Sequence, residues 1–164
     1  MSVQTKSVGQ IALGWWSANI SKRETGHARG LSARLRRAGP IEALSETAVH
    51  ELGQNLSVGP AQADKLVRLV CLLSEVREHD SLPLARRLGG SEPMLSSLRF
   101  QRLMRAEELE LVSLMRRAIM MSDRRCNIAA LASDLWNWDD AARTRWCFHY
   151  FGADAPAVDF KEKI

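Results

Sequence analysis

Apolar residues recur through most of this chain at the three- and four-residue spacing that places them on one face of a helix. No stretch alternates apolar and polar residues as a half-buried strand does, and no Asn-Gly hairpin turn occurs. We therefore expect an all-α fold with no sheet. The pattern predicts helices over residues 8–20, 26–40, 41–56, 61–78, 95–105, 108–119, 128–136 and 139–151, with one further turn at 84–88.

Two of these segments carry the bulkiest apolar content. Residues 61–78 are apolar on most sides, which predicts a central, buried helix. The first helix carries Trp15 and Trp16 side by side. Because neighbouring helical residues diverge by about 100°, we expect one indole in the core and the other at a seam between helices or at a subunit interface.

Helix-breaking residues gather between positions 79 and 93, namely Pro83, Gly89, Gly90 and Pro93. We expect two small helical bundles packed together, with their boundary in this stretch. The predicted division is an N-terminal helical half at 1–80, a linker loop at 81–93 and a C-terminal helical half at 94–164. The tail from Ala153 to Ile164 contains Pro156 and mixed charge and is expected to be irregular.

A row of arginines lies on the helix predicted at 95–105. Phe100, Leu103 and Met104 share an arc of roughly 100°, whereas a second arc of about 120° carries a row at i, i+3 and i+6. That row is Arg99, Arg102 and Arg105. The next helix opens with acids and closes with Arg116 and Arg117, an arrangement that the helix dipole alone explains. The dipole does not explain the row on the preceding helix.

The helix predicted at 26–40 is also rich in arginine and has no acidic residue. Its apolar face, Ala28 to Ala38, is flanked by Arg29, Arg34, Arg36 and Arg37. Of the 23 basic residues in the chain 18 are arginine, although the net charge is only +4. Arginine binds phosphate bidentately. Two interpretations stay open: a phosphate-facing patch, or solvated helix ends in a protein whose codon usage favours arginine.

Composition narrows the class of protein. The 164-residue chain is 46% hydrophobic with a mean hydropathy of −0.20, as in ordinary globular proteins. No apolar run approaches the roughly 20 residues that span a bilayer, and no secretory signal opens the sequence, so we expect a cytoplasmic protein. The three cysteines, Cys71, Cys126 and Cys147, are widely spaced and odd in number, which favours a reducing compartment.

Catalytic motifs find no support in the sequence. Cys147 and His149 lack a partner pair for zinc, and Asp139 with Asp140 is explained as a helix start. There is no phosphate loop and no nucleophile elbow. We expect no enzymatic activity, no metal and no cofactor. Three tryptophans could stack on unpaired bases or simply fill the core: Trp136, Trp138 and Trp146.

The order and spacing of these segments resemble the CasB family, the small subunit of the type I-E CRISPR surveillance complex, Cascade. The resemblance covers residues 10–152. It rests on Trp15-Trp16, RLRRA at 34–38, the apolar helix at 65–76, LSSLRFQRLMRAEELE at 95–110, LMRRAI at 114–119 and LASDLWNW with RTRWCFHYF near the end.

This resemblance implies a non-catalytic subunit, present as a pair beside other Cascade subunits. It would bind guide RNA and target DNA without reading their sequence, and would steady the R-loop and the displaced strand while a separate protein cuts. The family's basic contact positions correspond here to Arg36, Arg37, Arg99, Arg116, Arg117 and Arg143. The helical arcs add Arg34, Arg102 and Arg105. A basic position at the start of the family's central helix is replaced by Ala61 or Gln62.

Two other functions remain open. The chain could be a helical structural adaptor that bridges subunits through its arginines without touching nucleic acid. It could also be a stand-alone regulator, although a recognition helix that reads bases normally pairs arginine with Asn or Gln for adenine.

Overall fold

The computed structural model describes residues 6–152 and is mainly helical, as predicted. The expectation for the tail from Ala153 to Ile164 falls outside the described residues. The helices are α1 (Val8–Asn19), α2 (Gly26–Arg37), α3 (Pro40–Leu44), α4 (Thr47–Asn55), α5 (Ala63–Leu73), α6 (Leu84–Leu88), α7 (Ser97–Arg105), α8 (Glu108–Met121), α9 (Ile128–Trp136) and α10 (Asp140–Tyr150), with a 3₁₀ turn η1 (Pro60–Gln62) before α5.

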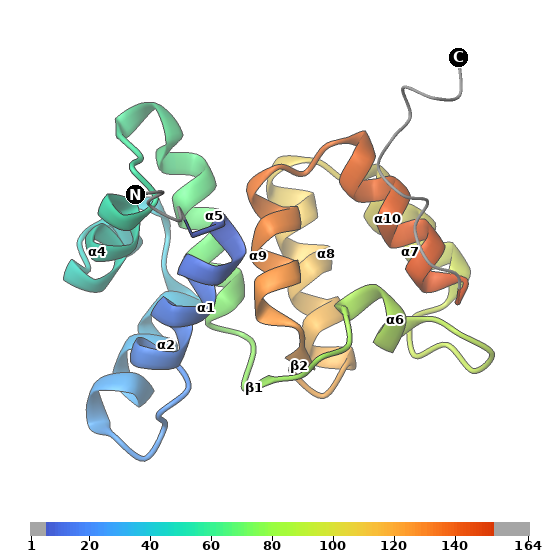
Figure 1. Cartoon of the computed structure of the whole chain (residues 1–164), viewed down its shortest axis with the longest axis horizontal. Coiled ribbons are helices and arrows are strands. Elements are labelled where there is room, and N and C mark those ends of the chain that lie inside the picture. Colours follow the sequence, from blue (N-terminus) through green and yellow to red (C-terminus); the bar gives the residue numbers. More distant parts are fainter. Residues whose placement is uncertain (1–5, 153–164) are drawn as a thin grey trace, which may run out of the picture.

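A small parallel sheet corrects the prediction of no sheet. Strand β1 (Glu78–His79) pairs with β2 (Arg125–Cys126). Two residues are too few to show the alternation by which a strand is recognised in sequence. The pairing is nevertheless consequential, because it brings the chain after α5 beside the chain after α8 (Figure 1).

Helix α5 is shorter than predicted, ending at Leu73 rather than near residue 78. The Ser74 hydroxyl donates to the Cys71 carbonyl at 2.6 Å, which competes with continuation of the helix. The Arg77 amide then donates to the Arg124 carbonyl at 2.8 Å. The chain therefore leaves the helix in order to pair with β2.

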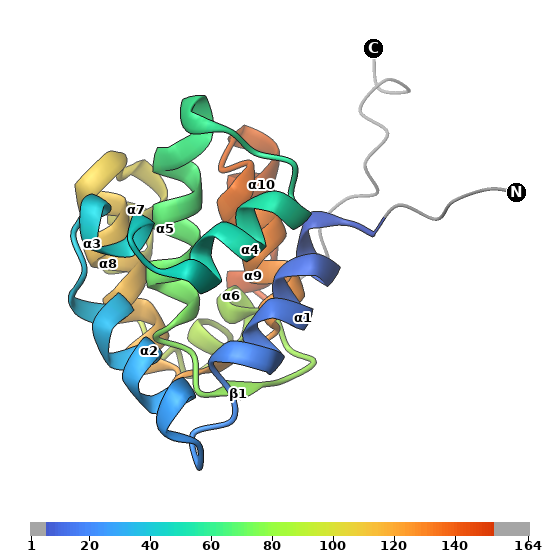
Figure 2. The ribbon, with the colours of Figure 1, turned by 90° about the vertical axis from the view of Figure 1, so that its left-hand side faces the viewer.

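The single helix predicted at 41–56 is wrong, since α3 and α4 are separate. The Ser45 hydroxyl donates to the Ile41 carbonyl at 2.7 Å, and Glu46 has an extended backbone. Because the break reorients α3, Ile41 is 73% exposed although its spacing placed it with the core residues. Figure 2 shows α4 in front of α5, with α3 on one side and α1 on the other.

Both early tryptophans are buried, which corrects the expectation that only one would be in the core. Trp15 Nε1 donates to the Ala48 carbonyl on α4 at 2.8 Å. Trp16 Nε1 donates to the Val76 carbonyl after α5 at 3.0 Å. Helix α1 is covered on several sides, because α9 also packs along it where Gly9 lies against Ala129.

The later helices close around an aromatic stack. The rings of Phe100 on α7 and Tyr150 on α10 lie 4.0 Å apart and nearly parallel. The Tyr150 hydroxyl donates to the Leu95 carbonyl, and the Gly90 amide donates to the Tyr150 carbonyl at 2.8 Å. These contacts fix α6, α7 and α10 to one another and leave the arginines of α7 outside the core.

One buried apolar cluster runs through helices from both ends of the chain, with α5 and α9 in contact at its centre. The division into two halves joined by a loop at 81–93 stays a prediction. Among residues 6–152, no helix is both long enough and apolar enough to cross a bilayer.

Candidate nucleic-acid interface

A buried carboxylate lies at the centre of the densest group of arginines. Glu75 follows α5 by two residues, and its side chain is 5% exposed. Its Oε2 lies 2.8 Å from Arg116 Nε on α8, and its Oε1 accepts a hydrogen bond from Arg124 Nη1 at 2.7 Å. Glu75 therefore joins the end of α5 to α8 and to the turn that follows α8.

Three further arginines surround the same carboxylate. Burial lowers the pKa of Arg23, and the nearby positive charges of Arg77 and Arg36 lower it further. Burial likewise lowers the pKa of Arg36, while Glu75 acts in the opposite direction. These mutual effects show that the guanidiniums repel one another. We call this group the Glu75 cluster: Glu75 with Arg23, Arg36, Arg77, Arg116 and Arg124.

Several N–H groups of the Glu75 cluster have no partner. Nε and Nη2 of Arg23 and Nη1 of Arg36 are buried and make no hydrogen bond within the described chain. A buried donor left unpaired costs about 1–3 kcal/mol. An anion bound beside these guanidiniums would offset the repulsion between them. The chemistry of the cluster therefore suits phosphate.

Local structure explains how residues far apart in sequence converge here. Thr25 caps α2, whose last turn carries Arg36 and Arg37. The β1–β2 pairing places Arg77 against Arg124, whose φ of 57° lies in the left-handed region. A non-glycine residue rarely adopts this conformation, and such positions are concentrated at functional sites.

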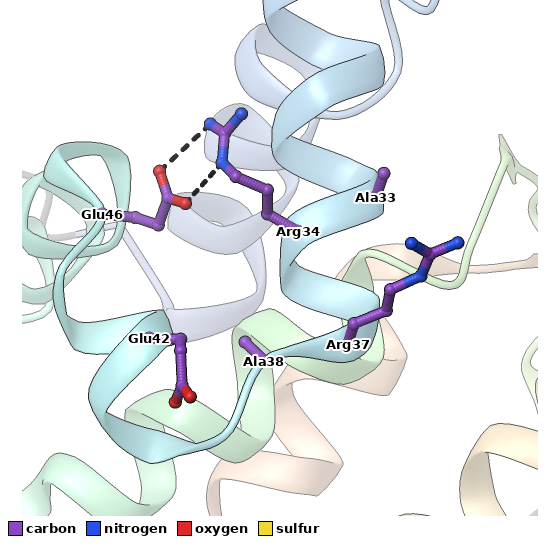
Figure 3. Close-up of a pocket in the computed structure, with 6 residues that line it drawn as sticks. All are labelled: Ala33, Arg34, Arg37, Ala38, Glu42 and Glu46. Carbon is purple, nitrogen blue, oxygen red and sulfur yellow. Dashed lines mark hydrogen bonds and ion pairs between the residues drawn. The ribbon is translucent and has the colours of Figure 1, made fainter.

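Arg34, a predicted site residue, is already paired. Its Nε and Nη2 donate to the two carboxylate oxygens of Glu46 at 2.6 and 3.1 Å (Figure 3). The hydrogen bond to Glu46 raises the pKa of Arg34. Arg37 points away from this pair, and both arginines border a hollow of about 350 Å³ that Glu42 and Glu46 also line. Two carboxylates make this hollow unsuitable for phosphate.

The predicted row on α7 is exposed, as its helical arc indicated. Arg102 Nη2 lies 3.5 Å from Glu110 Oε2, a long surface ion pair of little energetic weight. Arg99 and Arg105 make no ion pair with any residue in the range 6–152. In Figure 2, α2, α7 and α8 lie toward the same side of the molecule.

The remaining predicted residues fall in different places. Arg116 belongs to the Glu75 cluster, whereas its neighbour Arg117 is exposed and has no ion pair in the described part of the chain. Arg143 on α10 lies 5.6 Å from the Trp138 ring and 3.5 Å from Asp140 Oδ1. Arg143 makes no contact with the Glu75 cluster.

Sequence reasoning missed four members of the Glu75 cluster. Arg23 precedes α2 in a break, Arg77 and Glu75 follow α5, and Arg124 lies in a polar turn. None stands at a helical spacing that marks a basic face. The adjacent pair Arg124-Arg125 was the one available signal, because a basic pair in a short turn is not needed for dipole compensation.

Other chemistry has little support in the described chain. Residues 6–152 hold no group of three His, Cys, Asp or Glu side chains placed to bind a metal ion. Burial raises the pKa of all three cysteine thiols, that of Cys126 to about 12. A thiol with a raised pKa is a poor nucleophile at neutral pH.

The comparisons with known proteins identify a family. No curated protein sequence matches the chain. A sequence model of the family described as CRISPR-associated protein Cse2 matches residues 31–151, well over half of the chain. The match runs from the middle of α2 to the end of α10 and includes every member of the Glu75 cluster except Arg23. The chain therefore belongs to the Cse2 family, which is the CasB family of type I-E Cascade.

Proposed function

We propose that this protein is the Cascade small subunit that holds opened nucleic acid. It binds the guide RNA–target DNA duplex and the displaced strand through phosphate contacts, without reading sequence. The Cse2 family is one of structural Cascade subunits and is not a known enzyme family. The observation that carries the proposal is the Glu75 cluster, where five arginines surround one carboxylate and several buried N–H groups lack partners.

Arginine side chains are suited to this kind of binding. Base pairing with the guide reads the sequence, so a small subunit needs only sequence-blind contacts. Arg36 and Arg116 of the Glu75 cluster would bind phosphate directly. The free guanidiniums of α7 and Arg117 would extend the path along the side that α2, α7 and α8 share. Each phosphate neutralised adds about 0.7 to the salt slope of single-strand binding.

The test is binding of the purified chain to single- and double-stranded DNA of unrelated sequences across a salt series. We expect weak, sequence-blind binding that falls steeply with salt. Arg36→Gln/Arg37→Gln and Arg99→Gln/Arg102→Gln should each weaken binding and lower the slope for single strands by about 1.4, since two phosphate contacts are removed. These doubles test the two ends of the proposed path separately.

The matched control is Arg34→Gln/Arg145→Gln, which removes the same charge from two arginines that already hold carboxylates. Arg34 binds Glu46, and Arg145 Nη2 lies 2.8 Å from Asp134 Oδ1. This control should bind almost as the unsubstituted chain does. No binding at any salt, or equal losses in all three doubles, would refute the proposal.

A second candidate function is that of an adaptor that bridges subunits and pairs with a second copy of itself. Exposed apolar side chains favour it: Leu98 on α7 and Leu109 at the start of α8 are 73% and 85% exposed. Leu98→Ser/Leu109→Ser, which changes no charge beside Arg99, should then weaken assembly with the other Cascade subunits, or self-association in sedimentation, while leaving DNA binding by the free chain unchanged. Loss of DNA binding in this variant would contradict a separate adaptor surface.

A further inference from the structure

Glu75 contacts the arginines of its cluster from the buried side. Its side chain is 5% exposed, whereas those of Arg124 and Arg116 are 22% and 31% exposed. One carboxylate oxygen faces each guanidinium. The carboxylate is therefore the inner partner, and the two arginines extend from it toward solvent.

The contacts leave most of each guanidinium available. A guanidinium has five N–H donors. Arg124 uses Nη1 for the Glu75 carboxylate and, at 3.4 Å, for the Glu75 main-chain carbonyl. Arg116 Nε approaches the carboxylate at 2.8 Å as an ion pair. The other N–H groups of both side chains make no hydrogen bond within residues 6–152.

The surrounding positive charge would repel Arg124 in the absence of Glu75. Arg23, Arg36 and Arg77 lie close enough to act on one another and on Arg124 electrostatically. A flexible arginine that is repelled by its neighbours would turn into solvent and would have to be ordered again at each binding event. Holding the side chain beforehand removes that entropic cost.

We propose that Glu75 is a positioning residue, whose buried carboxylate holds Arg116 and Arg124 in place to receive nucleic-acid phosphates. This role rests on the proposed function. Although Glu75 is negative, it strengthens binding to a polyanion, because the order that it imposes on two arginines outweighs the charge that it subtracts.

Measuring DNA binding distinguishes a positioning role of Glu75 from a purely electrostatic one, because the two predict opposite changes in affinity when Glu75 is neutralised. Glu75→Gln adds one positive charge, so charge alone predicts tighter binding to single-stranded DNA. Positioning predicts binding that is weaker by about tenfold, the equivalent of one charge-assisted hydrogen bond, with a shallower salt slope. Glu75→Asp keeps the charge, and its affinity for DNA should lie between those of the unsubstituted chain and Glu75→Gln. The matched control Glu46→Gln frees the surface Arg34 and should bind at least as tightly as the unsubstituted chain.

A second measurement needs no nucleic acid. Phenylglyoxal labelling of arginines, followed by peptide mass spectrometry, should be several-fold faster at Arg116 and Arg124 in Glu75→Gln and unchanged there in Glu46→Gln. At Arg34, labelling should be several-fold faster in Glu46→Gln and unchanged in Glu75→Gln. Unchanged labelling of Arg116 and Arg124, or unsubstituted affinity in Glu75→Gln, would refute positioning. No DNA binding by the unsubstituted chain would instead refute the proposed function.

If Glu75→Gln fails to fold, a second pair of variants still tests the positioning role. Arg124→Gln and Glu75→Gln/Arg124→Gln differ only in Glu75, and the double variant replaces the ion pair with two amides that can hydrogen-bond. Positioning of Arg116 predicts weaker DNA binding by the double variant than by Arg124→Gln, despite its additional positive charge. Tighter binding by the double variant would show that Glu75 competes with phosphate.

Discussion

Trp15 and Trp16 connect α1 to two other parts of the fold through their indole N–H groups. We predict that Trp15→Phe and Trp16→Phe each lower the free energy of unfolding by about 2 kcal/mol, because each removes a buried hydrogen bond and leaves a small void. Trp138→Phe is the control. Trp138 is half-buried and its Nε1 has no partner among residues 6–152, so the loss should stay below about 1 kcal/mol. Urea denaturation measures the free energy of unfolding of all three variants. Equal losses would contradict a stabilising role for the Trp15 and Trp16 hydrogen bonds.

These tryptophans also show how far single residues can be predicted from sequence. Helical geometry correctly separates their directions by about 100°. The geometry cannot tell how many neighbours cover the helix. Here α4 meets one indole and the segment after α5 meets the other, so both are buried. The arginines differ in the same way: the arc of Arg99 and Arg105 was correct, but nothing local revealed that Glu46 binds Arg34.

The buried thiol of Cys126 gives a pH-dependent prediction. Burial raises its pKa to about 12 from an ordinary value of 9.0. The unfolded chain therefore releases this proton at a lower pH than the folded chain. Stability should fall as pH rises above 9, by up to about 1.4 kcal/mol per pH unit from this group.

Denaturation of the unsubstituted chain and Cys126→Ala at pH 8 and pH 10.5 measures this contribution, because the substitution removes it and leaves the other titrations in place. The difference in stability between the two proteins should shrink at the higher pH. A difference that is independent of pH would show that Cys126 ionises in the folded protein. Cys147→Ala, at a half-buried site, should show a smaller change.

At the scale of elements, two glycines of α1 give opposite predictions. A Cβ at Gly9 would lie 2.5 Å from the Ala129 carbonyl oxygen on α9, a backbone atom that cannot move aside. Gly9→Ala should therefore force α1 and α9 apart and destabilise the protein by about 1–3 kcal/mol. A Cβ at Gly14 would meet no atom of the described residues, 6–152, within 4 Å. Gly14→Ala should stabilise it by about 0.5–1 kcal/mol, the ordinary gain in a helix interior.

Thermal unfolding of the two variants decides this prediction, since both carry the same substitution in the same helix. Destabilisation by Gly14→Ala would show that α1 is more closely covered than its surroundings indicate. A neutral Gly9→Ala would show that α1 and α9 can separate at little cost.

Element boundaries were predictable where capping residues mark them. Ser7, Thr25, Ser96, Asn127 and Asp139 each cap a helix close to its predicted start. The failures lie where a serine hydroxyl binds a carbonyl of its own helix and the chain then turns toward a distant partner. The end of α5 depends on the carbonyl of Arg124, and the break before α4 lies at Glu46, whose carboxylate binds Arg34. Apolar spacing contains no information about either partner.

At the scale of the whole molecule, the Glu75 cluster lay beyond prediction from the sequence. Its members come from a break, a helix end, a strand edge, a second helix and a turn; packing of α5 against α2 and α8 brings some together, and the pairing of β1 with β2 brings Arg77 beside Arg124. Two of its six members, Arg36 and Arg116, were nonetheless named, as basic contact positions that the resemblance to the CasB family implies. The spacing of residues along a helix shows which of them share a face, but it does not show which other segments of the chain pack against that face.

Within the Glu75 cluster, Arg36 is expected to have opposite effects on the stability of the fold and on DNA binding. Burial and the charges of neighbouring arginines lower its pKa, so its positive charge opposes folding, and its Nη1 is buried without a partner in the part of the chain that the structure describes. We predict that Arg36→Gln leaves the free energy of unfolding unchanged or raises it by up to about 1 kcal/mol, while DNA binding weakens. The gain should shrink with added salt, which screens the repulsion.

Arg34→Gln, two residues earlier on α2, is the matched comparison. Arg34 holds Glu46 at the surface, so its loss should lower stability by up to about 1 kcal/mol and leave DNA binding unchanged. Denaturation and binding measured together on both variants would separate an arginine that serves the fold from one that serves a ligand. If Arg36→Gln instead unfolds more easily and Arg34→Gln binds DNA more weakly, these assignments are reversed and the phosphate path must be placed at Arg34.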